Sequence, residues 1–197
     1  MKSGSDDAHK SKQVARLAAT YSDLSALQES RQVSQHSDER EVRSTMFAIT
    51  SQPEFGIAVF SFLLHFVWEY LQAPTYVGMT DLPHWEGVKL CTSATIGDVG
   101  IALTAFWIAS AVSGSRYWFV VPGLTGVLTY LAVGVALTVG LEYYYTEISI
   151  RWTYSDLMPL VPPFGTGLSP LLQWLVIPQL ALWFTRRQLP RDRPDQI

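Results

Sequence analysis

Four long runs of hydrophobic residues, separated by short polar segments, dominate the chain from residue 55 onward. They cover approximately residues 55–72, 88–112, 118–141 and 168–185. A bilayer core ~30 Å thick needs roughly 20 apolar residues at 1.5 Å of helical rise each. The runs lack the alternation of barrel strands, and only helices and closed barrels satisfy their own backbone polar groups in lipid. The pattern therefore predicts an all-α membrane protein with a bundle of four transmembrane helices.

The segment before these runs has a different composition, rich in Ser, Gln, Asp, Lys and Arg. Such a composition predicts a disordered N-terminal tail, with one weak amphipathic helix over residues 14–27. Met46 lies just before the first run and is an alternative start of the protein. The expected organisation is a tail over 1–50, a transmembrane domain over 51–187 and a second tail over 188–197.

Charged residues make up only 16% of the 197 residues, against about 25% in soluble domains. The net charge of −3 argues against a nucleic-acid partner, which needs a basic surface. Basic residues flank the hydrophobic runs on one side of the expected bundle: Arg40, Arg43, Arg116, Arg186 and Arg187. By the positive-inside rule we expect a multi-pass protein of the cell membrane with both termini in the cytoplasm. Membrane lipids are its expected partners.

Several polar side chains interrupt the hydrophobic runs. In the first run, His65, Glu69 and Gln72 have i, i+4 and i+7 spacing, which places them on one helical face. The other three runs contribute Asp98, Glu142 and Gln173. All of these residues fall in the outer half of the expected bilayer. Because an ionisable residue inside a membrane costs roughly 2.5–3.5 kcal/mol, it is a functional candidate. We expect one polar pocket between the helices, open toward the outer loops.

The two outer loops, over 75–87 and 142–167, are rich in aromatic residues and proline. Tyr and Trp suit the headgroup region of a bilayer. The loops therefore form either a lid over the pocket or an ordinary aromatic belt.

Four interpretations of the pocket are open. In the first, the polar residues only bond to one another and hold the helices together, and each interhelical bond contributes roughly 0.6 kcal/mol. In the second, they catalyse acid–base chemistry on a hydrophobic small molecule, because carboxyl and imidazole groups in an apolar site transfer protons readily. In the third, they bind a metal ion, although the hydrophobic runs contain no second His. In the fourth, they form part of a small transporter, although the inner half of the bundle has few polar residues.

Of these, we favour acid–base isomerisation or binding of a lipid-like substrate, with no metal and no cofactor. The catalytic candidates are His65, Glu69, Asp98 and Glu142, and the substrate-binding candidates are Trp68, Gln72, Gln173 and Trp174.

Three short matches resemble the EXPERA domain, a four-helix membrane unit found in emopamil-binding sterol isomerases. They are His65 with Glu69, the acid Asp98, and the Trp-Leu-Val-x-Pro segment that begins at Trp174. The resemblance implies that the His and the acids move a proton and stabilise a cationic intermediate, and that the Trp faces the ligand. Here the second run carries Asp in place of the usual Glu, and the loop over 151–174 is similar instead to uncharacterised small bacterial membrane proteins.

Overall fold

The computed structural model of the protein describes residues 31, 35–36 and 38–189, and the chain divides into two units, Met1–Ile49 and Thr50–Ile197. Residues 38–49 of the first unit are helical, although the composition predicts disorder there. Arg40 Nε donates to His36 Nε2 at 3.0 Å, and side-chain contacts one turn apart support a helix. The weak helix expected over 14–27 lies outside the described residues, as does most of the C-terminal tail.

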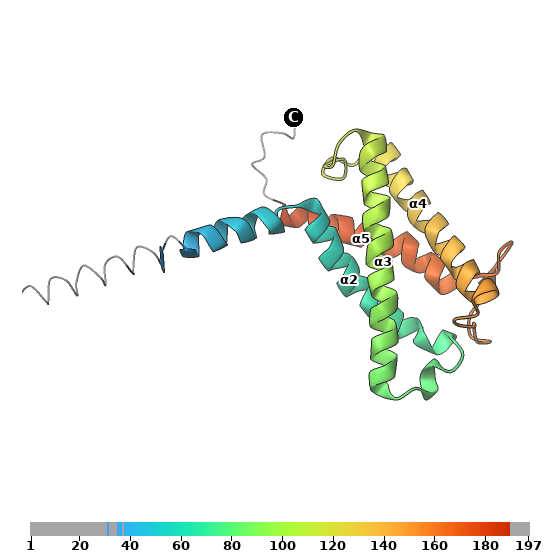
Figure 1. The fold of residues 1–197 in the computed structure, drawn as a ribbon. Helices are drawn as coiled ribbons and strands as arrows, with labels where there is room; N and C mark the ends of the chain where they lie inside the picture. The colour runs from blue at the N-terminus through green and yellow to red at the C-terminus, as the bar shows by residue number, and fades with distance from the viewer. Residues whose placement is uncertain (1–30, 32–34, 37, 190–197) are drawn as a thin grey trace, which may run out of the picture. The chain divides into compact units, whose positions relative to one another are not determined.

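Four helices make up most of the second unit (Figure 1): α2 (Pro53–Gln72), α3 (His84–Ser113), α4 (Leu124–Tyr143) and α5 (Leu168–Gln188). Each of them is long and apolar enough to cross a membrane. Large hydrophobic side chains such as Leu63, Ile96 and Leu128 are exposed on them, as expected of surfaces that face lipid. The predicted bundle of four apolar helices is confirmed at this level, and it supports a multi-pass membrane protein.

Proline and glycine determine where the helices begin and end. Pro53 occupies the first turn of α2, where its missing N–H costs no hydrogen bond. Gly114 ends α3 in a left-handed conformation, with φ +69°, which glycine adopts without a steric penalty.

The third hydrophobic run is not helical throughout, so the predicted boundary at Trp118 is wrong. The helix α4 begins only at Leu124, because Pro122 and Gly123 precede it and proline disfavours a helical residue before it. Residues 115–123 form a compact connection in which Trp118 and Phe119 are buried. Hydropathy alone does not distinguish such a buried connection from a helix.

We call the end of the bundle with this connection the turn end. A packed hydrophobic core lies there, built on Phe106, Trp118, Phe119 and Tyr130. The ring of Trp118 packs directly on Gly126, leaving no room for a Cβ atom. Close packing of this kind forms where aromatic rings meet small residues.

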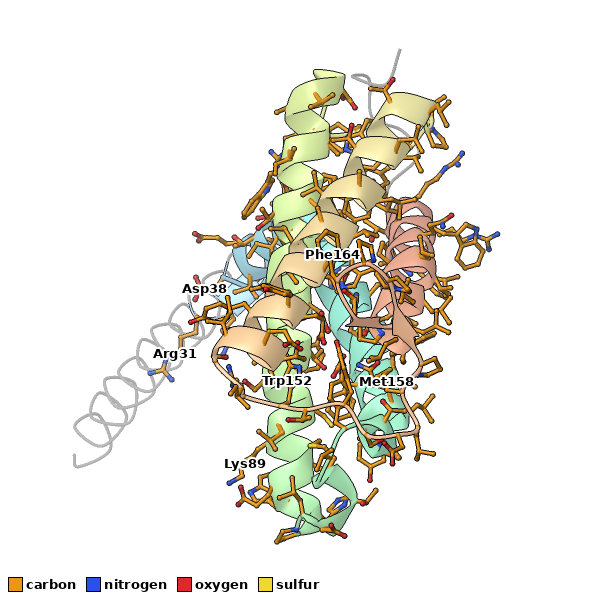
Figure 2. The ribbon with its side chains drawn as sticks, turned by 90° about the vertical axis from the view of Figure 1, so that its right-hand side faces the viewer. Arg31, Asp38, Lys89, Trp152, Met158 and Phe164 are labelled. Atoms are coloured by element: carbon orange, nitrogen blue, oxygen red, sulfur yellow. The ribbon has the colours of Figure 1, made fainter. Side chains whose placement is uncertain are left out.

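The opposite end, which we call the loop end, carries the two longer connections. The first contains the short 3₁₀ turns η1 (Ala73–Thr75) and η2 (Met79–Asp81). The second begins with a π-helical turn, η3 (Tyr144–Ile148), and ends in an antiparallel pair, β1 (Leu160–Val161) with β2 (Thr166–Gly167). Figure 2 shows this second connection, with Trp152 and Met158, between the ends of α4 and α5.

The two connections bind each other through their backbones. Val77 N donates to Thr153 O and Ser155 N donates to Thr75 O, both at 2.9 Å, so Tyr76 and Tyr154 form a β-bridge. An aromatic belt alone would not need these bonds. The pairing holds the two outer loops together at the loop end.

Candidate functional site

The polar face predicted for α2 points into the bundle at the loop end. His65 is fully buried and Gln72 is 5% exposed, so both face neighbouring helices. The helix α2 packs against α3 and α5, and the polar residues of those helices lie opposite it.

Gln173 of α5 joins three of the expected site residues at a single atom. Its Nε2 lies 2.7 Å from His65 Nδ1, 3.0 Å from Glu69 Oε1 and 3.2 Å from Asp98 Oδ2. His65 Nδ1 also lies 3.3 Å from Asp98 Oδ2. An amide nitrogen carries only two hydrogens, so it cannot donate to all three neighbours at once. Of the three, His65 and Asp98 are close enough to exchange a proton directly, whereas the amide of Gln173 separates them from Glu69.

A second amide extends this network toward the loops. Gln72 Nε2 donates to Glu69 Oε1 at 2.7 Å and to Gln173 Oε1 at 3.3 Å. Ser169 Oγ donates to Gln72 Oε1 at 2.7 Å and accepts from Trp68 Nε1 at 3.1 Å. These bonds hold both amide groups in one orientation.

Glu142, at the end of α4, has partners of its own. It accepts hydrogen bonds from the phenol of Tyr154 and from Trp152 Nε1. Burial raises the pKa of Tyr154 well above its usual range, and the charge of Glu142 raises it further. The phenol therefore stays neutral and remains a donor. The polar side chains thus form two hydrogen-bonded groups: the network around Gln173, and Glu142 with the second loop.

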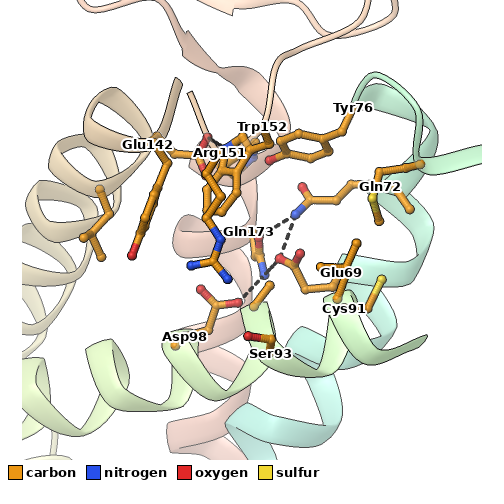
Figure 3. Close-up of a pocket in the computed structure, with 18 of the residues that line it drawn as sticks. Glu69, Gln72, Tyr76, Cys91, Ser93, Asp98, Glu142, Arg151, Trp152 and Gln173 are labelled. Atoms are coloured by element: carbon orange, nitrogen blue, oxygen red, sulfur yellow. Dashed lines mark hydrogen bonds between the residues drawn. The ribbon is translucent and has the colours of Figure 1, made fainter. Parts of the chain in front are cut away.

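Both groups border one cavity of about 460 Å³ (Figure 3). Its polar lining residues include Glu69, Gln72, Asp98, Glu142 and Gln173. Many of the others are apolar or small, such as Leu90 and Ala94 of α3 and Leu141 of α4. Apolar lining with a few convergent polar groups is typical of a ligand site. Among the described residues, no group of three His, Cys, Asp or Glu side chains is arranged to bind a metal ion.

Two of the candidate residues lie behind the wall of the cavity. His65 and Trp68 are absent from its lining; His65 contacts the ring of Trp174 instead, with 5.3 Å between the ring centres. Trp174 does border the cavity, and its ring packs on Gly134 of α4, where a Cβ atom would have no room. His65 can therefore reach a ligand only through Asp98 or Gln173.

Some polar atoms beside the cavity have no hydrogen-bond partner among the described residues. They include Trp174 Nε1 and Thr138 Oγ1 in the lining, and His65 Nε2 behind it. A buried polar atom left unpaired costs about 1–3 kcal/mol. Such atoms are rare in native structures, and each calls for a specific explanation.

Several lining residues were not predicted from the sequence, and Arg151 is the most important of them. Its guanidinium carbon lies 5.3 Å from the ring centre of Tyr145 and 5.7 Å from that of Trp152. Ile150 before it has φ +46°, which is rare for a β-branched residue and costs about 1–3 kcal/mol. One signal was available: Arg151 is the only Lys or Arg in the two outer loops.

Tyr76, Trp152 and Cys91 also line the cavity without having been predicted. Burial raises the pKa of Tyr76 far above its usual range, with a further contribution from Glu142. Its phenol is therefore a neutral group at the cavity wall. Their positions depend on how the loops fold back and how α3 is rotated, and neither follows from hydropathy.

Comparison with protein-family models, with curated proteins and with solved structures found no match to this chain. The resemblance to the EXPERA domain therefore stays a prediction, and the functional argument depends on the geometry of the cavity.

Proposed function

We propose that this chain is a multi-pass membrane protein that binds a hydrophobic, lipid-like molecule in the cavity at the loop end and isomerises it by acid–base chemistry. The observation that carries the proposal is the coexistence of a void of about 460 Å³ with carboxyl groups on its wall. A polar core that only held the helices together would have no use for the void. Ligand pockets usually measure about 300–1,000 Å³.

The geometry suggests a division of roles. Asp98, 15% exposed in its side chain and 3.3 Å from His65, transfers a proton to a double bond of the substrate. Glu69 removes a proton from a neighbouring carbon, so the isomerisation consumes no net proton. Before the next turnover Glu69 loses the proton that it has gained and Asp98 regains one, and His65, 3.3 Å from Asp98, is the group that exchanges a proton with Asp98. These roles agree with what the EXPERA resemblance implies for the same residues.

The second candidate is a purely structural role, and the direct hydrogen bonds favour it. Gln173 joins three helices through His65, Glu69 and Asp98. Such bonds stabilise membrane bundles modestly, by about 0.6 kcal/mol each on average. This interpretation explains the bonds but leaves the void and the unpaired atoms beside it unexplained.

Thermal stability distinguishes the two candidates. The purified protein, Glu69→Gln and Asp98→Asn would be melted in detergent with and without a membrane lipid extract. Glu86→Gln is the control, because Glu86 is exposed and pairs only with Lys89 at the same end. A ligand that binds the folded state raises the melting temperature.

If the cavity binds a lipid, the extract stabilises the wild type and the control by several degrees, and the two site variants much less. Mass spectrometry of the co-purifying molecule then identifies its class. If the site variants melt several degrees lower while the extract changes nothing, the polar residues are structural.

The proposal includes an orientation. Arg116, Arg186 and Arg187 lie at the turn end, so the positive-inside rule places that end and both termini in the cytoplasm of a cell-membrane protein. The cavity then opens toward the outside. A reporter that is active only in the cytoplasm, fused to the C-terminus, tests this orientation; an inactive fusion that is stably produced contradicts it.

A further inference from the structure

The cavity has one basic residue in its lining, and this residue lies at the mouth. Arg151 follows the π-helical turn after α4, and Figure 3 shows its guanidinium pointing into the cavity toward Asp98. Within the described part of the chain, Arg151 forms no ion pair with a carboxylate. Its side chain contacts the ring faces of Tyr145 and Trp152. A ring face attracts the positive charge of the guanidinium, but the five N–H donors of the guanidinium need hydrogen-bond acceptors of their own.

The acids of the cavity already have donors of their own. Amide groups donate to Glu69 and Asp98, and Trp152 and Tyr154 donate to Glu142. The donors of the guanidinium therefore remain for a group that enters the cavity. Guanidinium binds carboxylate and phosphate oxygens through paired hydrogen bonds.

The backbone orients Arg151 toward the cavity. Its N–H donates to Tyr145 O at 2.8 Å, and Ile150 before it adopts the unfavourable left-handed conformation. An arginine that only served solubility could extend into water without this conformation. Strained backbone of this kind concentrates at ligand sites.

We infer that Arg151 binds the anionic head of an amphiphile, a phosphate or carboxylate group, while the apolar chain lies along Leu90, Ala94, Ile101 and Leu141. This inference rests on the proposed function and specifies its substrate class. The head stays at the mouth, near the expected membrane surface, and the chain passes the acids deeper in the cavity. A double bond in that chain would then lie within reach of Asp98 and Glu69.

Cys91 provides a direct test, because it lines the cavity and is the only cysteine in the chain. Its thiol would be alkylated with N-ethylmaleimide in lipid nanodiscs in the presence of dodecyl phosphate, dodecanol, dodecylamine or inorganic phosphate. A bound amphiphile shields the thiol and slows its alkylation. Cys91→Ser gives the background labelling.

The variants are Arg151→Gln, Arg151→Lys and a matched control, Arg187→Gln. Arg187 also stacks on an aromatic ring, with its guanidinium carbon 4.0 Å from the ring centre of Trp183, but it lies at the turn end. We expect dodecyl phosphate to protect at a concentration at least roughly tenfold lower than dodecanol, because a charge-assisted hydrogen bond contributes about that factor. Arg151→Gln removes this preference, Arg151→Lys retains part of it, and the control keeps it.

The other outcomes separate the two proposals. Equal protection by dodecyl phosphate and dodecanol overturns the role of Arg151 but leaves the lipid-binding cavity intact. Strongest protection by dodecylamine also overturns it, because the acids then select the headgroup. Protection by inorganic phosphate alone indicates a site for a soluble anion and contradicts an amphiphile. If the thiol of Cys91 is alkylated in the free protein and none of the four compounds slows the reaction, the proposed function fails as well.

Discussion

The two ends of the bundle are built from the same four helices but differ in what fills the space between them. At the turn end, α3 presents Ala102, Ala105, Phe106 and Ala109, all fully buried. At the loop end the same helix presents Cys91, Ala94, Gly97 and Asp98 to a cavity. The turn end is packed and apolar, whereas the loop end is hollow and polar.

The helix α4 shows the same change along its length. Gly126 and Gly134 receive the rings of Trp118 and Trp174. One turn past Gly134, Thr138 borders the cavity, and Glu142 follows after another turn. Trp174 lies at the boundary, because it belongs to the packed core and also borders the cavity. The turn end thus supplies the stability that allows the loop end to remain open.

The largest expected effect is the loss of a core ring at the turn end. Phe106→Ala should lower the free energy of unfolding by about 3 kcal/mol or more, because it leaves a cavity in a packed core. Leu141→Ala, at the loop end, should lower it by less than about 1 kcal/mol, because Leu141 is 40% exposed and borders an existing void. Reversible unfolding in mixed detergent measures both values. Equal losses would contradict the division of the bundle into a packed and a hollow end.

A pair of glycines in α4 gives the next largest contrast. Gly134→Ala should destabilise the protein by about 2 kcal/mol, because the new Cβ overlaps the ring of Trp174. Gly140→Ala adds a Cβ that meets nothing within 4 Å and should stabilise the helix by up to about 1 kcal/mol. Differential scanning calorimetry detects the opposite signs. If both substitutions stabilise, Trp174 does not pack against α4.

These contrasts also explain how much of the molecule could be predicted from its sequence. The spacing of His65, Glu69 and Gln72 places them on one face of a helix whatever the rest of the chain does. Because polar side chains are costly in contact with lipid, Asp98 and Gln173 are also expected between the helices, in one site with them. Hence the four hydrophobic runs and most of the polar wall were recognisable from residue type and position.

The remaining features depend on contacts between segments far apart in the chain. Trp118 is as hydrophobic as a helical residue, so its place in a buried connection follows only from its packing on Gly126. His65 and Glu69 lie on the same face of α2, but only Glu69, which is one turn nearer the loop end, lines the cavity. Arg151 faces inward because the second loop folds back on Tyr145, and the conformation of a loop cannot be predicted from hydropathy.

A cavity-filling substitution separates stability from binding at the loop end. Gly97 borders the cavity, and a Cβ there meets nothing within 4 Å. Gly97→Leu should therefore leave the protein at least as stable as the wild type, because apolar burial and helix propensity both favour the larger residue. It should abolish the stabilisation by lipid extract that the proposed function expects. Retention of that stabilisation would show that the ligand lies elsewhere.

A modest effect is expected from the attachment of the second loop to α4. Tyr154→Phe removes the phenol donor of Glu142 and should destabilise the protein by about 1 kcal/mol. Local opening of the loops should increase, so the amide hydrogens of Val77 and Ser155, which bond across the two loops, should exchange faster. Tyr143→Phe is the control, because Tyr143 is 46% exposed.

This last effect also has a predicted pH dependence. Because burial raises the pKa of Tyr154 well above its ordinary value of about 10, its phenol keeps its proton, and the bond to Glu142 persists, as the pH passes the range where an exposed phenol ionises. Loop exchange in the wild type, corrected for the intrinsic rate, should therefore stay slower than in Tyr154→Phe at pH 10. If the two proteins converge near that pH, the phenol ionises normally and its bond to Glu142 does not hold the loop, so the backbone pairing of the two loops and the bond from Trp152 to Glu142 would carry the attachment.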